Sequence, residues 1–141
     1  MDDFTFYAFV GAQGIAAIAV FAFVWFWPGP WNAQRVLGSV LLVAGMLLVF
    51  VARLQLGRSF SVTPQARQLV THGLYSKIRN PIYVFGTVAI AGFCLLLQRP
   101  AGWLLVILVI VVQAARARKE ARVLEAKFGD EYRSYRNRTW F

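Results

Sequence analysis

The sequence predicts an all-α polytopic membrane protein, a bundle of about four transmembrane helices with a helical C-terminal extension. Of its 141 residues, 59% are hydrophobic, which is more apolar surface than one small soluble domain can bury. Uncharged stretches recur along the chain, and residues 4–27 exceed the roughly 20 residues that cross a bilayer. The length fits a single membrane domain over residues 1–141.

Four apolar stretches are the expected membrane spans. They cover residues 4–27, 36–56, 82–98 and 101–115. Only Arg99 and Pro100 separate the last two stretches, so these are expected to form a tight helical hairpin.

The first stretch has features of a span rather than of a secretory signal. Acidic residues precede it, its apolar run is too long, and no small-residue cleavage site follows. Gly11 and Gly14 predict close packing of this helix against a neighbour. Trp25, Trp27 and Trp31 predict an aromatic belt at the membrane surface.

Two polar regions complete the organisation of the chain. The loop of residues 57–81 is rich in turn-forming residues and is expected to be mostly irregular. In the tail of residues 116–141, small and apolar residues recur every three or four positions, which predicts a helix ending near Gly129. Residues 130–138 are expected to form a short amphipathic helix with Tyr132 and Tyr135 on one side.

Basic residues are distributed unevenly, and the net charge is +9. They lie in and beside the polar loop and in the tail, whereas the opposite loops carry only Arg35 and Arg99. The positive-inside rule therefore places the loop, the tail and both termini in the cytoplasm, in the plasma or inner membrane if the cell is prokaryotic. Anionic lipid is the expected neighbour of this basic face, and nucleic-acid binding is not expected.

Several common kinds of site are absent from the sequence. His72 and Cys94 are the single histidine and cysteine, so neither a zinc site nor a disulfide is predicted, and Cys94 is expected to be an apolar filler. The glycines of the first stretch do not form a dinucleotide-binding fingerprint, and the sequence contains neither a P-loop nor a Ser-His-Asp set.

The polar island, residues 72–86 with the sequence HGLYSKIRNPIYVFG, interrupts the apolar chain, and such islands mark places for chemistry or recognition. Asn80 and Pro81 have the preferred residue types for the N-cap and first position of a helix. The free N–H groups of that helix start, with Arg79 beside them, suit a carboxylate or phosphate. Simple capping by Asn80, and a snorkelling role for Arg79, explain the same residues.

Glu120 and two tyrosines also have two interpretations each. Glu120 either pairs with Arg116 four residues earlier or turns toward the polar island, where it would bind hydroxyls or a cation. Tyr75 and Tyr83 are either interfacial aromatics or rings that pack against a cation or a flat ring.

The order of LGRSFSVTP, LVTHGLYSKIRNPIYVFG and EARVLEAKFGDEYRSYRNRTWF resembles the isoprenylcysteine carboxyl methyltransferase and phospholipid methyltransferase group of integral membrane enzymes. The family pattern is Gly-x-Tyr, then Arg-His-Pro-x-Tyr-x-x-Gly, then a Glu-Glu pair with later Leu, Phe-Gly and two Tyr. The matching residues are Gly73, Tyr75, Arg79, Pro81, Tyr83, Gly86, Glu120, Leu124, Phe128, Gly129, Tyr132 and Tyr135.

The resemblance implies that S-adenosylmethionine is the methyl donor, bound at the cytoplasmic side. The residues it implies for this site are His72, Gly73, Leu74, Tyr75, Arg79, Asn80, Pro81, Tyr83 and Glu120. Arg79, Asn80 and Glu120 are the candidate catalytic residues among them. A lipophilic acceptor, an isoprenoid thiol or carboxylate or a phospholipid amine, would enter from the bilayer.

Two positions differ from the family pattern. Asn80 stands where the family usually has His and does not titrate near neutral pH, so proton transfer is not expected there. Ala121 replaces the second Glu of the pair. Two other functions stay open: a non-catalytic four-span protein that binds lipid or a partner, and a sterol-reductase-like NADPH enzyme. The sequence makes no prediction for the oligomeric state.

Overall fold

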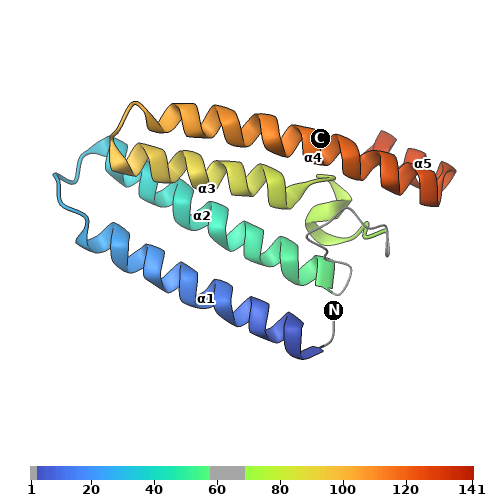
Figure 1. The fold of residues 1–141 in the computed structure, drawn as a ribbon, viewed down its shortest axis with the longest axis horizontal. Coiled ribbons are helices and arrows are strands. Elements are labelled where there is room, and N and C mark those ends of the chain that lie inside the picture. Colours follow the sequence, from blue (N-terminus) through green and yellow to red (C-terminus); the bar gives the residue numbers. More distant parts are fainter. Residues whose placement is uncertain (1–2, 58–68) are drawn as a thin grey trace.

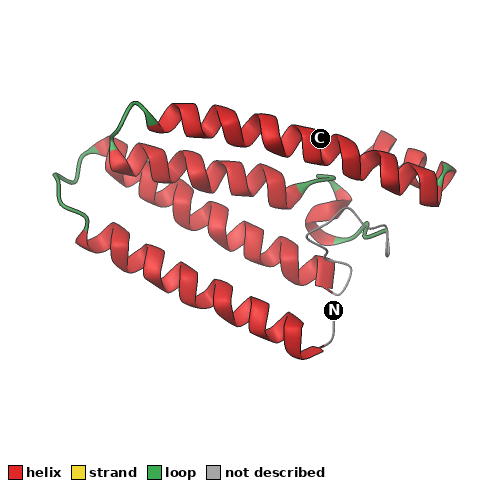
Figure 2. Cartoon of the chain, in the orientation of Figure 1, coloured by secondary structure: helices red, strands yellow, loops and turns green. Residues whose placement is uncertain are grey.

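The computed structural model describes residues 3–57 and 69–141, and the all-α prediction is confirmed over these ranges (Figures 1 and 2). The helices are α1 (Asp3–Phe26), α2 (Ala33–Leu56), the short 3-10 helix η2 (Gly73–Ser76), α3 (Pro81–Leu97), α4 (Gly102–Phe128) and α5 (Asp130–Arg138). An isolated bridge between Ile78 and Trp140 is the one β pairing within the described residues. The motif LGRSFSVTP falls largely on residues 58–68, outside the described ranges.

Each expected apolar stretch coincides with a helix, and the expected helix ends are confirmed. Pro81 is the first residue of α3, and the α3–α4 hairpin turns at Gln98, which adopts a left-handed conformation with φ of 55°. Gly129, with φ of 50°, ends α4 and precedes α5, whose Tyr132 and Tyr135 are both buried. Glycine adopts this left-handed conformation without the steric cost that a side chain would add, so the long α4 can end at Gly129.

The four long helices lie side by side in chain order, with α3 between α2 and α4 (Figure 1). The α1–α2 and α3–α4 connections meet at one end of the bundle, here called the turn end. The C-terminus of α2, η2 and the start of α3 lie at the other, the island end, past which α4 and α5 extend. The topology therefore gathers the polar island and the tail at one end.

Glycines allow α2 and α3 to approach until their backbones touch. A Cβ atom added at Gly38 would lie 2.6 Å from the backbone nitrogen of Leu96, and one at Gly45 would lie 2.7 Å from that of Ala89. A Cβ at Gly92 would lie 2.5 Å from the backbone nitrogen of Leu42. In a lipid environment the hydrophobic effect does not bring helices together, and small residues allow close van der Waals packing instead.

The expectation of close packing at Gly11 and Gly14 is wrong. A Cβ atom at either position would meet nothing within 4 Å. Helix α1 touches α2 mainly near its C-terminal end, where Val20, Val24 and Trp27 join a small apolar core. The glycines that support close packing are in α2 and α3, because these two helices share the longest interface.

Replacing Gly92 by alanine is expected to destabilise the protein by about 1–3 kcal/mol, the usual cost of overpacking. The same change at Gly14 is expected to be neutral or stabilising by up to about 1 kcal/mol, because the added methyl meets open space. Thermal unfolding in detergent measures both variants against the parent protein. Equal melting temperatures for the two variants would contradict the close packing of α2 against α3.

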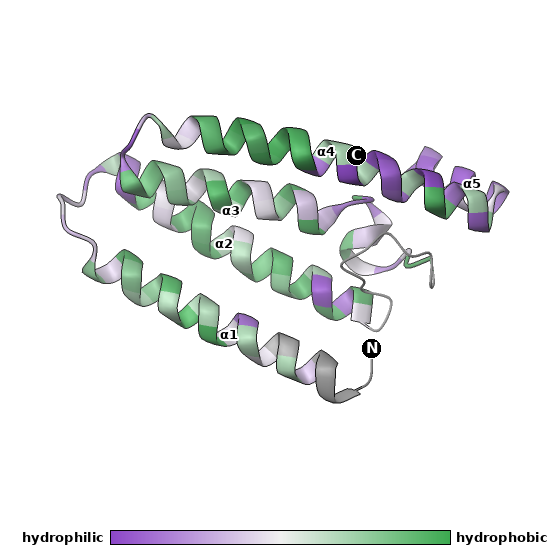
Figure 3. Cartoon of the chain, viewed as in Figure 1, coloured by the Kyte–Doolittle hydropathy of each residue, from purple (hydrophilic) through white to green (hydrophobic). Residues whose placement is uncertain are grey.

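Hydrophobic residues make up most of α1, α2, α3 and the first half of α4 (Figure 3), and many of their large side chains are exposed. On α4 alone the exposed set is Trp103, Leu104, Leu105, Ile107, Leu108, Ile110, Val111 and Val112. Among the described residues, α2 is the one helix that by itself is long and apolar enough to cross a membrane. Gly11–Phe26 and Pro81–Leu97 form shorter apolar helical segments. Exposed apolar surface this continuous is unusual for a soluble monomer and favours a membrane location.

Candidate functional site

A tight turn anchors the polar island to the end of α2. Gly73 has φ of 60°, and any side chain added there would collide with the amide of Gln55. The side-chain oxygen Oε1 of Gln55 accepts a hydrogen bond of 2.7 Å from the backbone N–H of Leu74. The left-handed backbone favours glycine at this position, and a larger residue would also displace the end of the Gln55 side chain.

The last residues of the chain cover the start of α3. Trp140 donates its N–H to the carbonyl of Lys77 at 2.7 Å, and Arg79 donates its N–H to the carbonyl of Trp140 at 2.9 Å. The N–H groups of Arg79 and Asn80 also lie 3.1 and 3.2 Å from the Phe141 oxygen. These bonds hold residues 139–141 against the polar island.

The prediction that this helix start presents free N–H groups is therefore wrong for Arg79 and Asn80. Asn80 does occupy the N-cap position, but its side chain makes no capping hydrogen bond. A segment about 60 residues further along the chain supplies the acceptor instead. Because the local pattern of a cap contains no information about such a distant partner, the sequence could not predict it.

Arg79 has an unfilled hydrogen-bonding position. Its positive charge acts on Tyr132 of α5, and its Nε atom is buried without a hydrogen-bond acceptor among the described residues. A buried guanidinium donor without an acceptor is energetically costly. The fork of Arg79 is thus available for a further acceptor, such as a carboxylate.

Glu120 turns toward the polar island. Its Oε2 atom accepts a hydrogen bond of 3.1 Å from the hydroxyl of Tyr83, which links α4 to α3. The guanidinium of Arg116 lies 5.8 Å from the centre of the Tyr83 ring, and its charge also acts on Glu120. The hydrogen bond to Tyr83 therefore places Glu120 beside the polar island, as the second interpretation expects, while Arg116 acts on it through its charge.

Burial has the largest influence on the charge of Glu120. It raises the pKa of the carboxyl, while the Tyr83 hydrogen bond and the charge of Arg116 lower this pKa to a smaller extent. The net result is a pKa above the ordinary glutamate value, so the carboxyl keeps its proton to higher pH than an exposed one would.

Four of the five tyrosines surround these two residues. Tyr75, Tyr132 and Tyr135 are at most 6% exposed, and Tyr135 donates its hydroxyl to the carbonyl of Tyr75 at 2.6 Å. Burial raises the pKa of Tyr135 to about 12, and burial together with the charge of Glu120 raises the pKa of Tyr75. All of these rings stay neutral at physiological pH and present apolar, electron-rich faces.

The structure gathers some of the predicted site residues and separates others. Tyr75, Arg79, Tyr83 and Glu120 belong to one cluster, through the contacts described above. His72 is exposed, and its side chain makes no capping hydrogen bond to η2. The remaining predicted residues build the backbone around the cluster: Gly73, Leu74, Asn80 and Pro81.

Sequence reasoning missed two glutamines that connect the helices near the cluster. Gln55 binds the backbone of η2 through its side chain, and the side-chain oxygen Oε1 of Gln113 accepts a 3.2 Å hydrogen bond from the hydroxyl of Thr87. The signal was present, because each glutamine interrupts an apolar stretch, and polar residues at such depths are often functional. Among the described residues, no cluster of three His, Cys, Asp or Glu side chains could hold a metal ion.

A change in pH is expected to act on stability through Glu120. Its pKa is raised in the folded state, so the folded protein binds the proton more tightly than the unfolded chain. The contribution of this carboxyl to stability therefore falls as pH rises from the ordinary value of about 4.3 through the folded pKa. The melting temperature of the parent relative to Glu120→Gln should fall over this range. A difference independent of pH would contradict the raised pKa.

Comparison with known proteins identifies the family. A model of the phospholipid methyltransferase family matches residues 33–131, which run from the start of α2 into α5 and contain the whole cluster except Tyr132 and Tyr135. Individual curated proteins give no match to the chain. The family description implies a methyltransferase, and the matched region covers more than half of the sequence. The chain therefore belongs to the phospholipid methyltransferase family.

Proposed function

We propose that the protein is an integral membrane methyltransferase that uses S-adenosylmethionine and methylates a lipophilic acceptor. The observation that carries this proposal is the cluster of Arg79, Glu120 and buried tyrosines at the island end, in which the Arg79 Nε atom lacks an acceptor. The family match supplies the reaction class, and the cluster supplies groups of the right chemistry.

The residues of the cluster suit the parts of S-adenosylmethionine. This donor supplies a methyl group activated by a sulfonium, and it also carries a carboxylate, two ribose hydroxyls and an adenine. Arg79 would hold the carboxylate, because its free Nε atom can add a charge-assisted hydrogen bond. Glu120 would accept hydrogen bonds from the hydroxyls, and the faces of Tyr75 and Tyr83 would pack against the cation or the adenine.

The protein itself would contribute mainly positioning and exclusion of water. Hydrogen bonds and burial already fix Glu120, Tyr75 and Tyr135, so little order would be lost on binding. The cluster has an apolar character that would leave an attacking thiolate or carboxylate poorly hydrated. Such acceptors need no strong base, which fits the presence of Asn80 where a histidine is usual.

We further propose that α1, α2, α3 and the first half of α4 cross the membrane, with the island end and both termini in the cytoplasm. The continuous apolar surface of these helices supports this arrangement (Figure 3). Positive charge also supports it, because hydrophilic residues gather on the second half of α4 and on α5, beyond the apolar part.

The acceptor would be a small lipid. Apolar side chains flank the island end, so a lipid tail would stay in the bilayer while its reactive group reaches the cluster. Both a phospholipid amine and an isoprenoid thiol or carboxylate have this form.

Calorimetric titration of the full chain in detergent tests the proposal. S-Adenosylmethionine and S-adenosylhomocysteine should both bind saturably, whereas NADPH should not. Binding of NADPH alone would favour a reductase, and folded protein that binds none of the three would overturn the methyltransferase proposal. Transfer of a labelled methyl group to lipid extracts, followed by chromatography of the products, would then identify the acceptor class.

A further inference from the structure

Arg35 is a buried cation at the turn end, far from the cluster. Its side chain is 2% exposed and donates to the carbonyls of Gly29, Trp27 and Val24 at 2.5, 2.6 and 3.1 Å. Its guanidinium also lies 4.2 Å from the centre of the Trp31 ring. These bonds hold the end of α1, but the Nε atom has no acceptor and the charge has no carboxylate partner.

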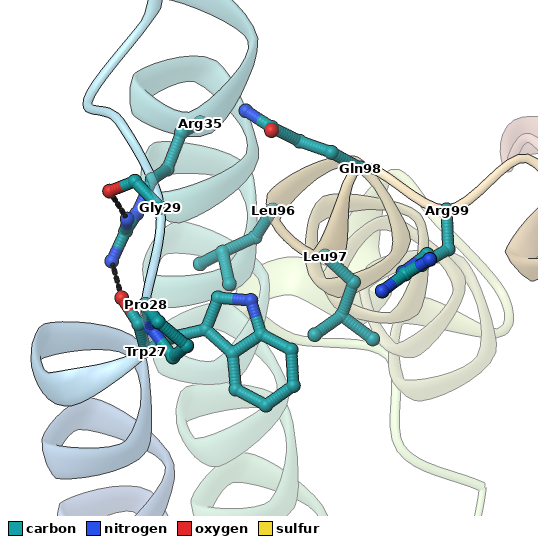
Figure 4. Close-up of a pocket in the computed structure, with 8 residues that line it drawn as sticks. All are labelled: Trp27, Pro28, Gly29, Arg35, Leu96, Leu97, Gln98 and Arg99. Atoms are coloured by element: carbon teal, nitrogen blue, oxygen red, sulfur yellow. Dashed lines mark hydrogen bonds between the residues drawn. The ribbon is translucent and has the colours of Figure 1, made fainter.

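A cavity of about 270 Å³ joins Arg35 to Arg99 (Figure 4). Its lining comes from both connections of the turn end: Trp27, Pro28, Gly29, Arg35, Leu96, Leu97, Gln98 and Arg99. Arg99 runs back beside Leu97 toward the cavity, and Gln98 donates its side-chain amide to the Asn32 side chain at 2.8 Å, which ties the two connections together. The site is therefore built by contacts between distant parts of the chain.

Charge makes this cavity unusual. The sequence contains no Asp or Glu from residue 4 to residue 119, so neither connection can supply a carboxylate. Arg35 and Arg99 are also the only two basic residues in the α1–α2 and α3–α4 connections and their immediate flanks, and the fold brings both to one cavity. An anion in this cavity would meet two positive charges, and neither connection supplies a carboxylate that would compete with it.

We propose that this cavity binds the phosphate of a membrane phospholipid. Trp25 and Trp31 are 64% and 53% exposed at the same end, and tryptophans with this exposure mark the level of lipid headgroups. Basic pockets between membrane helices are known headgroup sites. The apolar floor of Trp27, Leu96 and Leu97 would contact the glycerol backbone, while Arg99 would face the phosphate and the buried charge of Arg35 would attract it.

This site is separate from the methyltransferase cluster. It lies at the opposite end of the helices, and it depends on the proposed membrane location but not on methyl transfer. The lipid bound there would brace the two connections and would not be the methyl acceptor.

Native mass spectrometry of the full chain with added phosphatidylglycerol tests the inference. Arg99→Gln is the informative variant, because Arg99 is exposed and caps no helix, whereas loss of Arg35 would release the end of α1. Arg118→Gln, an exposed arginine on α4 near the island end, is the matched control. Loss of one charge-assisted bond should weaken phosphatidylglycerol binding about tenfold in Arg99→Gln and leave it unchanged in the control.

Further measurements test the position of the site and the identity of its ligand. Diacylglycerol with the same acyl chains should bind more weakly than phosphatidylglycerol, and a headgroup photo-crosslink should map to residues 27–35 and 96–99. Equal binding of the two lipids, or equal effects of the two substitutions, would overturn the site. If inorganic phosphate binds to this site and phosphatidylglycerol does not, a phospholipid is not the occupant. Unchanged S-adenosylhomocysteine affinity in Arg99→Gln would show that this site is independent of the proposed activity.

Discussion

Replacing Arg79 by alanine is expected to weaken binding of S-adenosylhomocysteine at least about 30-fold. Removing one partner from a buried charge pair costs about 2–5 kcal/mol, and in the proposed function Arg79 is the partner of the ligand carboxylate. Methylthioadenosine lacks that carboxylate, so its affinity should be the same in the variant and in the parent. Calorimetry with the two ligands measures the difference directly.

Lys77→Ala is the matched control for Arg79→Ala. Lys77 is exposed and lies two residues away, and only its backbone takes part in the bond to Trp140. Its replacement should leave both affinities unchanged. If Arg79→Ala weakens both ligands equally, Arg79 acts by holding Tyr132 in place rather than by binding the carboxylate.

Replacing Glu120 by glutamine is expected to weaken binding of the same ligand about 10- to 100-fold. Hydrogen bonds to a charged group contribute about 1.5–3 kcal/mol, and glutamine offers one uncharged acceptor oxygen where the carboxylate offers two charged ones. In the parent protein, affinity should rise as pH rises through the raised pKa of Glu120, because the ionised form is the stronger acceptor. The variant should lose this pH dependence.

A ligand without the ribose hydroxyls separates binding from structure in this experiment. Its affinity should be nearly equal in the parent and in Glu120→Gln. Glu125→Gln is the control on the same helix, because Glu125 binds the exposed Arg133 at 2.9 Å and has no contact with the cluster among those described. Equal affinities of the Glu120 and Glu125 variants for S-adenosylhomocysteine would remove Glu120 from the site.

Much of the fold follows from local features of the sequence. Apolar stretches define α1 to α3 and the first half of α4, Pro81 begins α3, and Gly129 ends α4. These features act within a few residues of themselves, through hydration of apolar groups and through backbone conformation. The family motifs also contain Arg79, Tyr83 and Glu120, which the fold brings into one cluster.

Helix packing could not be read from the glycines alone. Gly11 and Gly14 have the spacing typical of a close interface, yet Gly38, Gly45 and Gly92 are the ones that form it. Helices α1, α2 and α3 are apolar on most sides, so the sequence does not indicate which face meets another helix. Only the three-dimensional arrangement decides which glycines face a backbone.

The sequence by itself determined the helical class, the helix ends, the charge asymmetry and the chemical types in the candidate site. The tertiary structure decided the contacts between distant residues: the Phe141 oxygen at the start of α3, Glu120 against Tyr83, and Arg35 with Arg99 around one cavity. The physical reason is that a hydrogen bond or a shared cavity depends on distance in space. Sequence patterns report only preferences along the chain. They therefore identify residues that can form a contact but not which two of them meet.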